Sequence, residues 1–149
     1  MSFPERLCLH LATLLTAATG LAYGWFRYFG LRPGDFGPEP HPLQGALQHL
    51  HLLLSPALVF LLGALLRSHV FPGWRSGKNA GRHSGAFLAL GMAPMILSGY
   101  AIQAVTDPAW RAAFAWIHGV SSLLFVGAYL LHALLAWARG RREKLEMPA

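Results

Sequence analysis

Four long stretches without a charged residue constrain this chain more than any other feature. They cover about residues 7–26, 43–66, 84–106 and 112–138. Each is about 20 residues or longer, which as a helix is enough to cross the roughly 30 Å hydrocarbon core of a bilayer. Only 12% of the residues are charged, whereas soluble domains carry about 25%. The pattern predicts an all-α fold, an integral membrane four-helix bundle.

The segments between these stretches are rich in proline and glycine, which predicts that helices end there. Such residues recur at 32–35, 37–40, 71–74 and 107–108. We therefore expect a single domain over residues 1–149, with helices at about 7–28, 43–69, 84–106 and 110–138. The first stretch is too long for the apolar part of a signal peptide, so we expect it to be a structural helix.

The distribution of positive charge predicts the orientation. Nine of the twelve lysines and arginines lie at the N-terminus, in residues 67–83 and at the C-terminus, and only Arg27, Arg32 and Arg111 lie on the other side. The positive-inside rule then predicts that both termini are cytoplasmic. Because these charges flank the apolar stretches and form no stripe with aromatics, a nucleic-acid partner is excluded. Tryptophans near the ends of the stretches predict aromatic belts at both membrane surfaces.

Histidine is the unusual polar residue here, and cysteine is almost absent. The chain has eight histidines and one cysteine, Cys8. One cysteine excludes an internal disulfide and the covalent haem-attachment motif, which needs two. Polar groups at membrane depth are costly and usually functional, so the histidines are the candidate functional residues.

His118 and His132 lie fourteen residues apart in the last stretch, close to four helical turns. On a helix they are about 40° apart in projection and about 21 Å apart along the axis, which places one in each leaflet. Phe125 lies midway on the same stripe. Two ligands so far apart cannot share one metal ion, but each can bind the iron of its own haem. Two noncovalently held b-type haems are therefore predicted.

Each haem needs a second axial ligand at a similar depth. For the periplasmic-side haem of His118, the second stretch offers His49 and His51, which are about 200° apart on a helix, so only one can face the core. We favour His51, which lies deeper and begins an apolar stripe. His49 is then an interfacial residue or a donor to a haem propionate.

For the cytoplasmic-side haem of His132, depth favours His10, about one turn inside the first stretch. His69 remains an alternative, although it lies about 27 Å from His51 along a helix, more than the 21 Å between the pair it must match. Arg67 and Arg82 are candidate partners of the propionates, or ordinary flanking charges. We expect His83 to lie at the surface and His41 to have no special role.

These residues resemble a known family. Four helices, with a histidine in Leu9-His10-Leu11, one at His51 and a pair ending in Leu131-His132-Ala133, are similar to the bacterial dihaem b-type cytochromes of the cytochrome b561 superfamily. That superfamily includes superoxide oxidase and the cytochrome b subunits of hydrogenases. The resemblance implies a bacterial inner-membrane protein in which the second helix and the first histidine of the fourth helix share one haem. The first helix and the second histidine share the other.

The predicted function is electron transfer across the membrane through two bis-histidine haems, between the quinone pool and a periplasmic c-type cytochrome or another redox subunit. Whether the chain is itself an enzyme stays open, and no catalytic residue is assigned. Ser98, Tyr100 and Gln103 could line a quinone pocket, although helix packing explains Ser98 equally well. The alternatives are a haem-free membrane anchor of a larger complex and a small transporter of metal ions or protons that uses the histidines.

Overall fold

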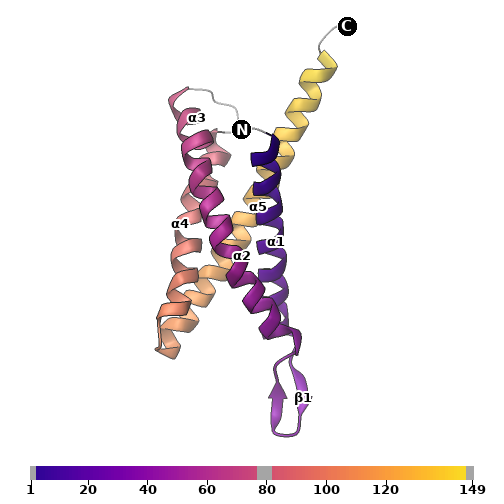
Figure 1. Ribbon diagram of the computed structural model, residues 1–149, viewed down its shortest axis with the longest axis vertical. Coiled ribbons are helices and arrows are strands. Elements are labelled where there is room, and N and C mark those ends of the chain that lie inside the picture. The colour runs from indigo at the N-terminus through magenta and orange to yellow at the C-terminus, as the bar shows by residue number, and fades with distance from the viewer. Residues whose placement is uncertain (1–2, 77–81, 147–149) are drawn as a thin grey trace. The chain divides into compact units, whose positions relative to one another are not determined.

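The computed structural model describes residues 3–76 and 82–146, with side chains over 3–76 and 85–142. Within these residues, four helices are long and apolar enough to cross a membrane: Phe3–Tyr28, Leu43–Arg75, Gly85–Ala104 and Pro108–Arg142 (Figure 1). The predicted all-α fold with four membrane-length helices is confirmed. The chain divides into two compact units, Met1–Ser68 and His69–Ala149, and each contains one pair of packed helices.

The first unit is a pair of helices, α1 (Phe3–Tyr28) and α2 (Leu43–Leu65), which pack against each other. The buried residues of α1 are Leu9, Thr13 and Thr16, spaced by four and three residues, so they lie on one face of the helix. Those of α2 are Leu58 and Leu62, again one turn apart. A narrow buried stripe on each helix thus forms this unit's interior.

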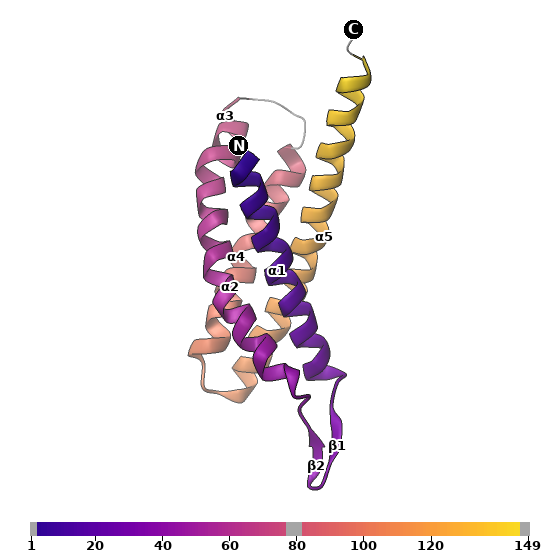
Figure 2. The same ribbon diagram turned by 45° about the vertical axis from the view of Figure 1, so that its right-hand side comes forward.

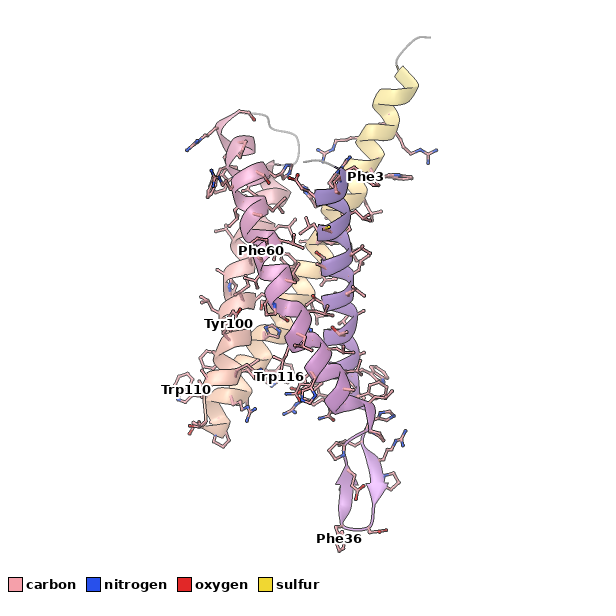
Figure 3. All side chains as sticks on the ribbon, viewed as in Figure 1. Phe3, Phe36, Phe60, Tyr100, Trp110 and Trp116 are labelled. Atoms are coloured by element: carbon pink, nitrogen blue, oxygen red, sulfur yellow. The ribbon has the colours of Figure 1, made fainter. Side chains whose placement is uncertain are left out.

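A short β-hairpin connects these two helices, and the sequence had predicted only turns there. Strand β1 (Arg32–Gly34) pairs antiparallel with β2 (Gly37–Glu39), and Gly34 is opposite Gly37. Gly37 has a φ of 122°, a conformation that favours glycine. Phe36 lies at the tip and is fully exposed (Figure 3). Strands of three residues containing proline lack the alternating apolar pattern by which strands are recognised, so the hairpin was missed.

His41, from which no special role was expected, ties this hairpin to the end of α1. Its ring stacks on Phe26 with the ring centroids 4.1 Å apart. The Arg32 guanidinium donates to its Nε2 at 2.8 Å. Partial desolvation and the positive charge of Arg32 both lower the pKa of His41. The neutral ring that accepts this hydrogen bond is therefore favoured in the folded protein.

Helical structure continues past the predicted end of the second span. A π-helical segment, η1 (Leu66–Val70), and a short helix, α3 (Phe71–Arg75), follow α2 directly. The turn predicted at Phe71-Pro72-Gly73-Trp74 is wrong, because Pro72 occupies the first turn of α3, where its missing N–H is tolerated. η1 changes the direction in which the following side chains point relative to an uninterrupted α-helix.

The second unit contains the pair α4 (Arg82–Ala104) and α5 (Pro108–Glu146), which pack against each other (Figure 2). α5 is 39 residues long and extends past the predicted end at residue 138. Charged residues end a membrane span but not a helix, and Arg141 continues the helix with its guanidinium 4.9 Å from the ring centre of Trp137. The charge-free stretch therefore predicts the length of the apolar span but underestimates the length of the helix.

Asp107 begins α5. One of its carboxylate oxygens accepts hydrogen bonds from the backbone N–H groups of Ala109 at 2.9 Å and Trp110 at 3.0 Å. This is an N-cap followed by proline at the first helical position, a combination that strongly favours helix initiation.

Replacing Asp107 with alanine removes this cap, and we expect local destabilisation of about 1 kcal/mol. Amide hydrogen exchange at Ala109 and Trp110 should then be about fivefold faster in detergent micelles. Thr106→Ala, one residue earlier, is the control and should leave both rates unchanged. Equal exchange rates in the two variants would show that Asp107 does not cap the helix.

Large apolar side chains project outward along all four spans. They include Leu53 and Phe60 on α2, Leu97 on α4 and Leu123 on α5, each more than half exposed. Trp25, Trp110, Trp116 and Trp137, near the span ends, are also mostly exposed, as the predicted belts require. Trp110 and Trp116 are labelled in Figure 3. Apolar surface of this extent needs lipid around it, so the chain is a multi-pass membrane protein.

Candidate functional site

His51 points from α2 toward α1. Its Nδ1 lies 3.0 Å from the backbone carbonyl oxygen of Thr16 and 3.5 Å from the hydroxyl of Thr19. A carbonyl oxygen only accepts, so Nδ1 carries the proton and donates it. In the neutral ring the lone pair is then on Nε2, the nitrogen through which a histidine can ligate a metal while its other N–H is held by a carbonyl.

The sequence of α1 makes room for this ring. A Cβ on Gly20 would lie 2.7 Å from Cε1 of His51, closer than real Cβ contacts allow. The Thr19 hydroxyl turns back onto its own helix, donating to the carbonyls of Leu15 at 2.8 Å and Thr16 at 3.1 Å. The imidazole therefore rests on a glycine, with a hydroxyl beside the carbonyl to which it donates.

His118 has the same surroundings in the second unit. Its Nδ1 lies 2.9 Å from the carbonyl oxygen of Met95 on α4 and 3.5 Å from the Ser98 hydroxyl. A Cβ on Gly99 would lie 3.0 Å from its Cε1. The Ser98 hydroxyl donates to the carbonyls of Pro94 at 2.5 Å and Met95 at 3.1 Å.

We call each set of three groups an imidazole cradle: the carbonyl of residue i, the hydroxyl of residue i+3 and the glycine at i+4. The cradle of His51 is Thr16, Thr19 and Gly20, and that of His118 is Met95, Ser98 and Gly99. Sequence reasoning missed this repeat. The signal it could have used is a hydroxyl residue directly before glycine, Thr19-Gly20 and Ser98-Gly99.

The structure distinguishes the two histidines of the 49–51 doublet. His51 is half-buried and hydrogen-bonded to α1, whereas His49 is exposed. The prediction that only one of them faces the neighbouring helix is confirmed. The 200° between them on α2 is the physical reason.

On α5, the predicted stripe is confirmed. Phe125 is 4% exposed, and His118 and His132 are both half-buried, so the three lie on the less exposed face of one continuous helix. The axial separation of the two imidazole-bearing residues is about 21 Å at 1.5 Å per residue.

His132 has two basic neighbours in its own unit. His69 and Arg139 are close enough to interact with it electrostatically. His69 itself is exposed and lies in η1, a kind of helical irregularity often found at functional sites. The π-helical segment turns His69 to a different direction from the one an unbroken α-helix would give it, which keeps His69 an alternative partner of His132.

The remaining sequence candidates are less informative. His10 is exposed on α1, and Arg67 is exposed in η1. The side chains of Arg82 and His83 lie outside the described residues. No group of three or more His, Cys, Asp or Glu close enough to hold a metal ion occurs among the described residues. A bis-histidine haem does not need such a group.

Two of the three proposed quinone-lining residues of α4, Ser98 and Tyr100, lie on different faces of the helix. Ser98 is 3% exposed and belongs to the cradle of His118, whereas Tyr100 is 57% exposed. These two residues are about 200° apart on the helix, so they cannot line one pocket by themselves. The structure gives Ser98 a role next to a histidine that neither earlier interpretation contained.

The Thr13 and Thr16 hydroxyl oxygens are buried on α1 and have no hydrogen-bond partner in the described part of the chain. A water or ligand oxygen beside α1 would remove the cost of leaving them unpaired.

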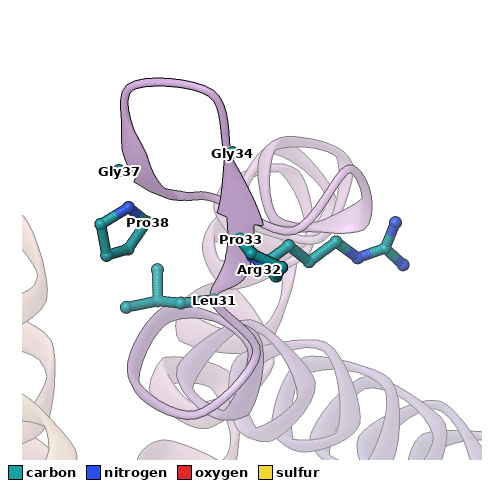
Figure 4. A pocket seen from close by; sticks show the side chains of 6 residues that line it. All are labelled: Leu31, Arg32, Pro33, Gly34, Gly37 and Pro38. Atoms are coloured by element: carbon teal, nitrogen blue, oxygen red, sulfur yellow. The ribbon is translucent and has the colours of Figure 1, made fainter.

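An open hollow at the hairpin contains no histidine (Figure 4). Its lining is Leu31, Arg32, Pro33, Gly34, Gly37 and Pro38.

Fold and site together define a class: an all-α, multi-pass membrane protein with two helix pairs, each holding a histidine against its neighbouring helix. No protein-family model matches the chain, and neither do any curated proteins or solved structures.

Proposed function

We propose that this chain is a membrane cytochrome b that carries electrons across the bilayer through two bis-histidine haems. The observation that supports it most is the pair of cradles around His51 and His118. A neutral histidine whose Nδ1–H is held by a carbonyl is oriented to ligate through Nε2, and metal-ligating histidines almost always donate their other N–H in this way. Bound haem supplies a one-electron iron couple.

The residues fit two haems, one at each side of the membrane. His51 and His118 would hold the periplasmic-side haem, the pairing that the sequence predicts. His132 would hold the cytoplasmic-side haem together with His10, and His69 is the alternative partner. With two imidazoles as its protein ligands, each haem would supply electron transfer rather than oxygen binding.

Charge and location support the rest of the proposal. The excess of lysine and arginine near the termini favours cytoplasmic ends. The resemblance to bacterial dihaem cytochromes implies an inner membrane. Electrons would then pass between a quinone in the membrane and a periplasmic redox partner, such as a c-type cytochrome. The chain's own contribution is to fix the spacing of the haems, to tune their potentials and to limit solvent access.

Purification of the full chain tests this proposal. The detergent-solubilised protein is expected to be red, with a reduced α-band typical of b-type haem and about two haems per chain. A colourless protein that takes up no haem when haem is supplied would contradict the proposal. That outcome would favour the membrane anchor or the small transporter.

A further inference from the structure

We infer that the two cradles are a repeated positioning device, one in each unit, that fixes the ligating tautomer of His51 and His118 and sets the affinity and potential of the haem proposed for these histidines. This inference rests on the proposed function and deepens it. Its positioning residues are Gly20 and Thr19 on α1, and Gly99 and Ser98 on α4. None of the four is required to touch the iron.

Two glycines let a helix backbone come close to an imidazole. Among the glycines of the described helices, Gly20 and Gly99 are the two whose added Cβ would meet a side chain of another helix, and in both cases that side chain is a candidate ligand. Gly24 and Gly119, on the same helix pairs, would meet nothing within 4 Å. Among the described helix glycines, close approach of the backbone to an imidazole thus occurs only in the two cradles.

The backbone carbonyl of each cradle has several hydrogen-bond donors around it. Helix geometry already assigns the Thr16 carbonyl to the N–H of Gly20, and the Met95 carbonyl to the N–H of Gly99. Each carbonyl also accepts from a hydroxyl at 3.1 Å and from an imidazole at 2.9–3.0 Å. A carbonyl oxygen has two lone pairs, so the hydroxyl and the imidazole compete for it.

Because of this competition, the hydroxyls should shift the reduction potential of the haem in one direction. Without the hydroxyl, the carbonyl becomes a stronger acceptor for Nδ1–H, which makes the imidazole a more basic ligand. A more basic ligand stabilises ferric over ferrous iron. Thr19 and Ser98 therefore hold the reduction potential of this haem higher than the carbonyls alone would.

The glycine experiment compares Gly20→Ala and Gly99→Ala with the controls Gly24→Ala and Gly119→Ala in the full chain. The first two are expected to weaken haem binding at the His51–His118 site about 10- to 100-fold, the range for lost ligand support. The controls should bind as the wild type does. Alanine is the better helix former, so propensity cannot explain a loss. Equal binding by all four variants would overturn the inference.

The hydroxyl experiment measures the potential of this haem in Thr19→Val and Ser98→Ala. Haem should stay bound, and the ferric form should be favoured up to about tenfold more, which is about 59 mV lower for one electron. Each cradle accepts a different hydroxyl residue, so Ser98→Thr and Thr19→Ser should restore the wild-type potential. Unchanged potentials in Thr19→Val and Ser98→Ala, or a shift that the hydroxyl-bearing variants reproduce, would contradict the inference.

A haem-independent measurement separates this inference from the proposed function. Nitrogen-15 NMR of the full chain without added haem should show both His51 and His118 protonated at Nδ1. If the wild-type chain binds no haem but both rings show this tautomer, the proposed function fails and the cradles stand. If haem binds to the wild type and the rings are protonated at Nε2 without haem, the cradles fail and the proposed function stands.

Discussion

His118→Ala is expected to bind one haem per chain instead of two. The variant keeps the cradle on α4 but loses the imidazole that the cradle holds, so His51 alone would have to retain the haem. One remaining ligand leaves the iron with an open axial position and weak attachment. The haem content from pyridine haemochromogen assays, divided by protein concentration, should fall from about two to about one.

Carbon monoxide provides a second measurement for the same variant. If two imidazoles ligate each haem, the reduced wild-type protein should not bind carbon monoxide. Any haem that His118→Ala retains at this site should bind it, and His51→Ala should behave in the same way. The matched control is His49→Ala, an exposed histidine on the same helix as His51, which should keep two haems. Two six-coordinate haems in His118→Ala would refute the ligand assignment.

His132→Ala is expected to remove the other haem and to leave the His51–His118 haem intact. His132 lies about 21 Å from His118 along α5, too far for one substitution to affect both sites directly. The spectrum of the remaining haem should therefore equal that of the haem lost in His118→Ala. A variant lacking both His118 and His132 should be colourless.

The partner of His132 is decided by two further variants. We expect His10→Ala to remove the same haem as His132→Ala. His69→Ala should retain that haem with a shifted potential, because His69 interacts electrostatically with His132. If His69→Ala removes the haem while His10→Ala keeps it, the ligand comes from η1 and the sequence-based choice of His10 is wrong.

The parts of the fold that could be predicted from the sequence depend on residues that act within their own segment. The charge-free runs predicted four spans because a helix of about 20 apolar residues satisfies its own backbone hydrogen bonds in lipid. Helix periodicity likewise predicted that Phe125 lies on the face of His118 and His132, and that His49 and His51 point in different directions. The ends of the helices were less predictable. Arg139 and Arg141 lie beyond the apolar span but still within α5. Pro72 lies in the first turn of α3 and does not end a helix.

The imidazole cradles could not be predicted in this way. The hydrogen bond from His51 joins residues 35 apart in the chain, and that from His118 joins residues 23 apart. Sequence spacing gives the face on which a side chain lies, but it does not say which carbonyl of another helix stands opposite. Gly99 and Ser98 could therefore be interpreted equally well as packing residues.

The sequence by itself determined that this chain is a membrane protein with four spans, and which histidines share a helical face. Both results depend on hydrophobicity and on the 3.6-residue repeat, which act within a single segment. Only the tertiary structure decided that Thr19-Gly20 and Ser98-Gly99 support the rings of His51 and His118. That pairing depends on how one helix is offset along its neighbour, which side-chain packing between the two helices sets.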